Sequence, residues 1–236
     1  MSMDEDARRT LFATVDGGRT FLVHRFDPPG ERTSYEVSLH RNYLTSAPER
    51  LPLPQDFPED FASEAEALDR IRQQWQVDAA EFQDVRLGRQ VDIDFVQALK
   101  LGTVEPLRAG MSTEAVVALL GVPEAVMSAV EPGDVCWFLG SVQLLMRDGR
   151  LQSFEIDRGE GRFTSLRFTG WFLEPRISRS RLEEALTSHG VGYSEVSYLG
   201  GQVLWVAGAR SHSGFLFDFY DEERLHALYW NLAPPV

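Results

Sequence analysis

The chain has 236 residues, of which 43% are hydrophobic and 25% are charged, and this composition excludes disordered and fibrous classes of protein. No apolar run approaches the ~18 residues that cross a bilayer, and the acidic first residues lack the apolar centre of a secretory signal. We therefore expect a soluble protein without a removable leader. The single cysteine, Cys136, excludes an intramolecular disulfide framework and indicates a reducing, cytoplasmic compartment.

The formal net charge is −13, from 36 acidic and 23 basic residues. This sign disfavours nucleic acid as a partner, because phosphate contacts need clustered lysine and arginine, and it is compatible with a basic protein partner. Much of the excess lies in residues 55–94, which hold eleven carboxylates and four arginines. This acidic stretch is either a solvated helix face or a docking surface. For a docking surface, the candidate contact residues are Asp56, Glu59, Asp60, Glu64 and Asp69.

The first third of the chain begins with strand patterns. Apolar residues over 10–15 and 21–26 flank a glycine turn and predict a hairpin. The period-two alternation of residues 35–39 predicts a third strand with one buried face. Four prolines between residues 46 and 60 predict a loop.

A helix follows this loop. Ser63 with Glu66 three residues later is typical of a capping box at a helix start. Leu68, Ile71 and Trp75 are spaced by three and four residues and give the helix an apolar stripe. Together with the strands, this helix predicts a small N-terminal α+β domain over residues 1–95.

A helix–strand–strand–strand pattern occurs twice in residues 96–236. The first copy covers about residues 101–156, where Ser112 begins a helix, Gly121 ends it, and three apolar segments follow. The second copy covers about residues 176–230 and begins its helix at Ser178.

The two copies match at several positions, which indicates a duplicated unit. Ser112 corresponds to Ser178 and Trp137 to Trp205. Placed side by side, two such units predict one shared antiparallel sheet with both helices on one face. Residues 157–175 connect the copies, and alternation over 163–172 predicts a further strand in this connector.

The start of the first copy also carries a family resemblance. Gly110-Met111-Ser112, followed by Leu120-Gly121-Val122-Pro123, resembles the Gly-Met-Ser to Leu-Gly-x-Pro opening of a widespread helix-plus-sheet unit. The chain is similar here to bacterial immunity-type proteins and to the fold shared by β-lactamase inhibitor protein and small outer-membrane-assembly lipoproteins. The resemblance implies a binding protein without catalytic residues. Because the chain shows no lipoprotein signal or lipid-bearing cysteine, we expect the immunity branch.

No motif in the sequence predicts catalysis, a metal or a cofactor. The five histidines lack metal-ligand spacing, and Cys136 lies in an apolar segment, where a buried thiol has a raised pKa and is inert. Asp92 and Asp94 lie on one face of an extended segment, as either a solvated edge or a cation site. The glycine pairs are turn signals without a phosphate-binding fingerprint. We expect no catalytic residue, cofactor or metal ligand.

Aromatic residues gather in the second copy, between positions 215 and 230. Core packing explains most of them, because each ring buries a large area. The alternative for Tyr220 and Trp230 is that they anchor a protein partner, since such residues dominate interface hot spots.

These patterns lead to three hypotheses about function. The leading one is a non-catalytic, cytoplasmic protein-binding module, most concretely an immunity protein that binds and neutralises a basic cognate toxin. The second is an enzyme or small-ligand-binding protein with a site between the N-terminal domain and the repeats. The third is a structural adaptor in a larger complex. Neither nucleic acid nor a membrane is expected as a partner.

Overall fold

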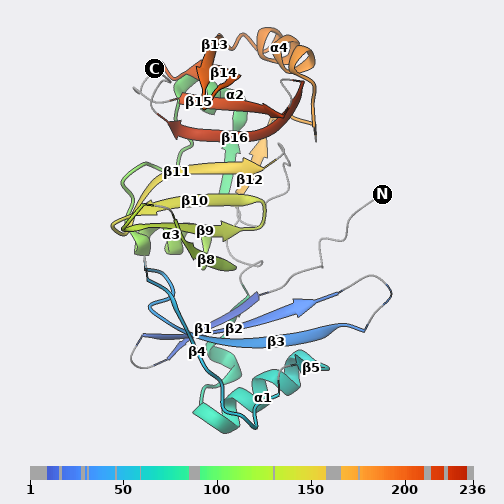
Figure 1. The fold of residues 1–236 in the computed structure, drawn as a ribbon, viewed down its shortest axis with the longest axis vertical. Coiled ribbons are helices and arrows are strands. Elements are labelled where there is room, and N and C mark those ends of the chain that lie inside the picture. Colours follow the sequence, from blue (N-terminus) through green and yellow to red (C-terminus); the bar gives the residue numbers. More distant parts are fainter. Residues whose placement is uncertain are drawn as a thin grey trace. The chain divides into compact units, whose positions relative to one another are not determined.

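A computed structural model describes the chain over residues 10–15, 18–27, 30, 32–45, 47–58, 60–84, 91–129, 131–157, 166–174, 176–209, 214–220 and 223–232. The chain divides into two units, residues 1–88 with 126–128, and residues 89–125 with 129–236 (Figure 1). The division falls between residues 88 and 89, earlier than the expected boundary at residue 95. The fold is α+β and is dominated by antiparallel sheet, as the sequence predicted.

The first unit contains a sheet in the order β4-β3-β2-β1-β6, with β5 also paired to β3. Its strands are β1 (Thr10–Val15), β2 (Arg19–Phe26), β3 (Ser34–Arg41), β4 (Glu49–Leu51), β5 (Asp60–Phe61) and β6 (Gln83–Asp84). The predicted hairpin and third strand are confirmed, because β1 pairs with β2 and β2 with β3. The predicted loop over 46–60 contains the short strand β4 and the start of β5.

The helix of this unit is α1 (Glu64–Trp75), and its start confirms the predicted cap. Ser63 Oγ accepts a hydrogen bond from Glu66 N–H at 3.2 Å. The Glu66 carboxylate accepts from Ala62 N–H at 3.2 Å, one residue before the partner that a strict capping box uses. A 3₁₀ turn, η1 (Ala79–Glu81), follows with a complete capping box between Asp78 and Glu81.

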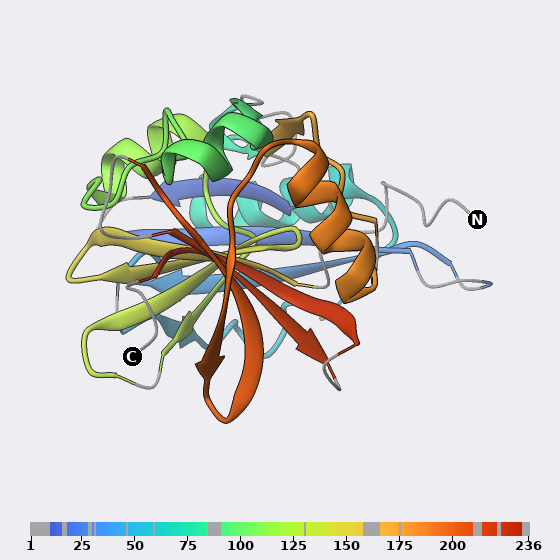
Figure 2. The same cartoon turned by 90° about the horizontal axis from the view of Figure 1, so that it is seen from above.

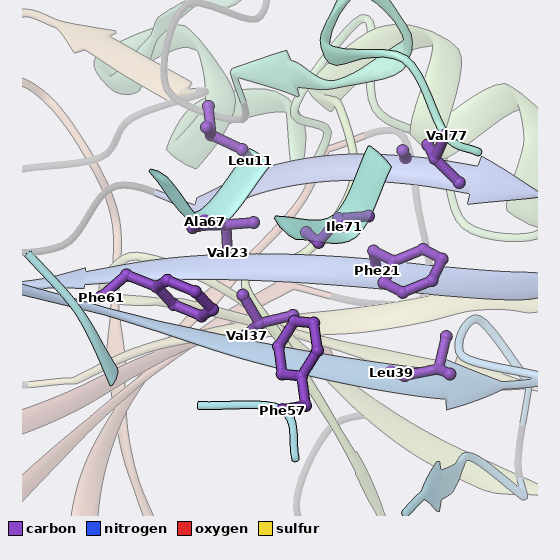
Figure 3. Packing of buried hydrophobic residues seen from close by; sticks show 11 residues of the cluster. Leu11, Phe21, Val23, Val37, Leu39, Phe57, Phe61, Ala67, Ile71 and Val77 are labelled. Carbon is purple, nitrogen blue, oxygen red and sulfur yellow. The ribbon is translucent and has the colours of Figure 1, made fainter. Parts of the chain in front are cut away.

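The core of the first unit lies between α1 and one face of the sheet (Figure 3). Ala67 and Ile71 of α1 are fully buried there, against Phe21, Val23 and other strand residues. The predicted stripe is confirmed in part, because Ile71 is buried whereas Leu68 and Trp75 are half-buried at the edge of the cluster.

The strands of the second unit form an antiparallel sheet in the order β13-β14-β15-β16-β11-β10-β9-β8, and of its eight strands only the edge strand β8 has residues, 126–128, that group with the first unit (Figure 1). The first repeat supplies α3 (Thr113–Leu120), β8 (Ala125–Ser128), β9 (Asp134–Leu139), β10 (Val142–Arg147) and β11 (Arg150–Asp157). The second repeat supplies α4 (Arg179–Ser188), β13 (Ser194–Tyr198), β14 (Gly201–Ala207), β15 (Gly214–Tyr220) and β16 (Arg224–Leu232). Each repeat therefore has one strand more than predicted, and the final strands β11 and β16 pair at the centre.

Equivalent hydrogen bonds in the two repeats confirm the duplication. Ser112 forms a bridge with Arg150, and Ser178 forms the same bridge with Arg224. The residue after each serine donates its N–H at 2.9 Å to the residue before the last strand, which is Gly149 O in one repeat and Glu223 O in the other. A register shift follows Leu145 in β10 and follows Asp218 in β15.

The predicted equivalence of the two tryptophans is wrong by one residue. Trp137 pairs with Leu144, and the matching pair in the second repeat is Leu204 with Phe217. Trp205 therefore corresponds to Phe138, and because neighbouring strand residues point to opposite faces, the two tryptophans lie on opposite sides of the sheet.

Two further elements lie outside the eight-stranded sheet. The connector strand is β12 (Leu166–Thr169), and it pairs in parallel with β7 (Val91–Asp94) in a separate two-stranded sheet. The helix α2 (Phe95–Leu101) follows β7 directly, with Asp94 accepting from Gln97 N–H as its cap. This pairing explains why residues 91–95 group with the second unit.

The helices α2, α3 and α4 lie on one side of the eight-stranded sheet, as expected (Figure 2). Phe154 and Trp230 mark this side, because they stack on each other and the Trp230 indole donates to Gly102 O, at the end of α2, at 3.1 Å. The described helices of the chain are all too short or too polar to span a bilayer.

Candidate binding surface

The opposite side of the eight-stranded sheet, which we call the open face, has no described helix packed on it. Side chains alternate along a strand, so the neighbours of Phe154 and Trp230 point to the open face. Cross-strand pairs form one row over seven strands of this face. In order, the row is Ser194, Trp205, Leu216, Tyr229, Glu155, Gln143 and Phe138.

The half of the open face that belongs to the second repeat is aromatic and apolar. Val203, Trp205 and Leu216 are buried there under a cluster that includes the half-buried Val196, Tyr198 and Tyr229. The side chains of this half that remain accessible are therefore Val196, Tyr198 and Tyr229, and tyrosine rings supply contact area at low entropic cost.

The half that belongs to the first repeat is polar and acidic. Glu155 is half-buried, and Asp157 lies two residues along the same strand and accepts a hydrogen bond from Gln143 Nε2 at 3.0 Å. Burial, and to a smaller extent the neighbouring Asp157 carboxylate, raise the pKa of Glu155 to about 7. The Tyr229 hydroxyl donates to Glu155 and opposes this shift in part.

Glu155 and Tyr229 lie where the two repeats meet. They are directly paired across β11 and β16. Phe154 pairs with Trp230 on one side of them, and Ile156 pairs with Leu228 on the other. Superposing each repeat on the other interchanges these two flanking pairs. The pseudo-twofold axis of the sheet therefore passes through this pair. Burial and the nearby Glu155 carboxylate raise the pKa of the Tyr229 hydroxyl, which stays protonated at neutral pH.

The rim of the aromatic half carries a further acidic group and an exposed hairpin tip. Asp218, about one-third exposed, lies 3.8 Å from His226 Nδ1. The β13–β14 hairpin ends at Leu199, which is 91% exposed and has a left-handed φ of 48°. The positive φ is uncommon for a residue other than glycine, whereas a single exposed apolar side chain is ordinary on a protein surface.

The acidic candidates predicted from residues 55–94 lie in the first unit, away from the open face in the sequence. Asp56 pairs with Arg70 at 3.1 Å and Asp69 with Arg72 at 2.9 Å, both as exposed ion pairs. Asp60 is exposed and Glu64 is half-buried. Glu59 lies outside the described residues.

Several of the remaining carboxylates in this stretch cap helices, a role that the sequence predicted for Glu66 alone. Glu66, Asp78, Glu81 and Asp94 all accept backbone N–H groups at helix starts. Asp92 forms a bidentate pair with Arg167 of β12 at 2.7 Å, so the proposed Asp92–Asp94 cation site has one carboxylate in an ion pair and the other in a cap.

The prediction of Trp230 as a surface anchor is wrong. Trp230 is 3% exposed, stacks on Phe154 and is hydrogen-bonded to the end of α2, so it belongs to the core on the helix side. For Tyr220, the structure describes only the backbone, which pairs with Arg224 in β15–β16. The partly exposed aromatic residues of the open face are instead Phe138, Tyr198 and Tyr229, and Trp205 lies on this face but is 6% exposed.

Cys136 is half-buried on the open face rather than in the core, because it pairs with Leu145 on that side. Burial raises its pKa, as expected, with smaller contributions from Glu155 and Asp134. Within the described part of the chain, no three His, Cys, Asp or Glu side chains lie close enough together to hold a metal ion. His40 bonds Ser38 Oγ at 3.0 Å, and burial lowers its pKa to about 4.

The central pair of the open face was missed because its two members are distant in the sequence. The alternation of residues 150–156 placed Glu155 opposite the buried Phe154 and Ile156, but nothing in the sequence pairs Glu155 with Tyr229. Comparisons of this chain with family models, with curated proteins and with solved structures found no match.

Proposed function

We propose that this chain is a non-catalytic, cytoplasmic protein-binding module, most concretely an immunity protein that binds and neutralises a cognate bacterial toxin, and that the open face is its contact surface. The observation that supports this proposal is the row of half-buried side chains that crosses the centre of the open face, Tyr229, Glu155, Gln143 and Phe138. The resemblance at Gly110–Ser112 points in the same direction.

The charges of the open face favour a basic partner. Glu155, Asp157 and Asp218 lie on or beside the row, and the chain as a whole carries −13. Complementary charge speeds encounter and selects among partners, whereas the aromatic half would supply most of the affinity.

A co-expression experiment tests this function. The product of the reading frame beside the gene is expressed in a host with and without this chain, and we expect that product to be toxic and the chain to restore growth. Absence of toxicity, or toxicity that the chain does not relieve, contradicts the immunity function.

Two matched variants then locate the surface. The open-face variant Tyr198→Ser with Asp218→Lys is expected to lose protection, whereas the first-unit variant Asp60→Lys with Asp69→Lys is expected to retain it. All four positions are at least partly exposed, so both variants should fold, which circular dichroism and thermal unfolding verify. Loss of protection in the first-unit variant alone would place the contact on the acidic stretch of residues 55–94.

A further inference from the structure

A cleft of about 470 Å³ lies in the second unit, where the segment after α4 passes the end of α2 and the end of β14. Leu99, Val191 and Val206 lie beneath it and are almost fully buried, whereas Lys100, Tyr193 and Ala207 line it with exposed side chains. This volume is within the range of small-molecule sites, which are apolar with a few polar groups that orient the ligand.

The charge of this cleft is opposite to that of the protein. Lys100 is the only lysine of the chain, its side chain is exposed, and no acidic residue lines the cleft. Over the described residues, the ion pairs found in the chain do not include Lys100, although many arginines are paired. An isolated ammonium beside apolar walls favours an anion with an apolar body.

Backbone donors point to the same chemistry. Gly190 N–H bonds Thr187 O and Val191 N–H bonds Leu186 O, which completes the end of α4. The next two N–H groups, of Gly192 and Tyr193, form no hydrogen bond to another described backbone group, and both residues are exposed at the cleft. A carboxylate can accept from such N–H groups and from an ammonium at once.

The walls of the cleft are held in place by contacts that exclude side chains. Gly208 packs so tightly on Gly102 that an added Cβ would lie 2.9 Å from Gly102 N, and Ala209 N–H donates to Lys100 O at 3.1 Å. The Trp205 ring lies over Gly214, where a Cβ would meet its Cζ2 at 2.9 Å. The end of α2, and with it the backbone of Lys100, is therefore fixed against β14, which lowers the entropic cost of binding.

We propose that this cleft binds a small organic carboxylate, with its apolar body against Tyr193 and Ala207, over the nearly buried Val206, and its carboxylate at Lys100 Nζ. This site is separate from the proposed function and does not depend on it. The structural alternative is that Lys100 only compensates the C-terminal dipole of α4, since Nζ lies 3.9 Å from the position that a Cβ of Gly190 would take.

The sole lysine makes a direct test possible. Reductive methylation of the full chain with ¹³C-formaldehyde labels Lys100 and the terminal amine, keeps both charges, and gives one side-chain NMR signal. Phenylacetate, indole-3-acetate and octanoate are titrated, with phenylacetamide as the neutral counterpart. We expect at least one carboxylate to shift the Lys100 signal saturably, while phenylacetamide leaves it unchanged.

Variants separate binding from stability. For the carboxylate that binds, intrinsic tryptophan fluorescence of the unmodified protein should report about tenfold weaker affinity in Lys100→Gln, because a charge-assisted contact is lost, and near-normal affinity in Lys100→Arg. Arg108→Gln removes an exposed cation that is paired with Glu105 and should change nothing. The proposal is overturned if none of the carboxylates moves the Lys100 signal at up to about 10 mM, a range that covers weak fragment-sized ligands, or if Lys100→Gln lowers thermal stability and leaves affinity intact.

Discussion

The folded protein disfavours the charged, deprotonated form of the Glu155 carboxyl group. It is half-buried between Asp157 and Tyr229 at the centre of the sheet, and its pKa rises from 4.5 to about 7. As pH increases, the unfolded chain releases this proton before the folded chain does. The stability that the protonated group contributes is therefore complete below about pH 4.5 and is lost as pH rises through about 7.

The substitution Glu155→Gln is expected to remove this loss of stability at high pH, because the amide stays neutral. The amide oxygen can still accept a hydrogen bond from the Tyr229 hydroxyl. We expect the variant to be about 1 kcal/mol more stable than the parent at pH 8, since partial exposure screens the ~3 kcal/mol that the full shift would represent. Urea unfolding between pH 4.5 and 8 measures it. Glu105→Gln, at an exposed ion pair with Arg108, is the control and should leave the pH slope unchanged.

Cys136 provides a second test at the residue scale. Its raised pKa leaves little thiolate at neutral pH, so a thiol reagent should label the native protein much more slowly than the urea-unfolded chain. Cys136→Ser should lower stability by about 1 kcal/mol or less and leave partner binding unchanged, because the side chain is only half-buried. Rapid native labelling, or loss of protection in a folded Cys136→Ser variant, would indicate a functional thiol.

At the scale of elements, α2 is fixed to β14 by the approach of two glycines. A side chain at Gly208 would collide with Gly102, and Trp230 and Ala209 add hydrogen bonds to the same helix end. The short helix thus depends on backbone contacts more than on its own seven residues, which are too few to be stable alone.

Gly208→Ala is therefore expected to cost about 1–3 kcal/mol, because the backbones must move apart. Gly192→Ala is the matched control: a Cβ there meets nothing within 4 Å, so stability should change by less than about 0.5 kcal/mol. Thermal unfolding of the two variants measures the difference. Equal stability would mean that α2 and β14 are not held by this approach.

Local patterns predicted the elements better than their pairing. Capping at Ser63 and Ser112 and the turn at Asp148-Gly149 are encoded by neighbours, and all were found where expected. The edge strand β13 was missed because Ser194–Tyr198 is short and largely exposed, with few apolar residues to mark it. The parallel pairing of β7 with β12 joins segments that are far apart in the sequence, and no local sequence pattern predicts it.

The open face shows the same limit. A one-residue slip in aligning the repeats put Trp205 on the helix side beside Trp137, and period-two alternation turns such a slip into the wrong face. Tyr229 and Trp230 belong to one aromatic cluster in the sequence, between positions 215 and 230, although they point to opposite sides of β16.

At the scale of the second unit, duplication produces a surface with two unlike halves. Two repeats with equivalent hydrogen bonds share one sheet, but at equivalent open-face positions the first repeat carries Glu155 and Phe138 where the second carries Tyr229 and Trp205. A partner on this face meets an acidic half and an aromatic half in a fixed order. The shared backbone hydrogen bonds thus make this surface rigid, and the different side chains of the two repeats make its two halves chemically distinct.

A site-specific photo-crosslinking measurement tests the open face as a contact surface most directly. A photoreactive phenylalanine analogue replaces Tyr198 on the open face or Asp69 on α1, and cells that co-express the product of the neighbouring reading frame, the proposed toxin, are irradiated. The account predicts a covalent adduct with that toxin from position 198 and none from position 69. An adduct from position 69 alone, or no adduct from position 198 while protection persists, would contradict it.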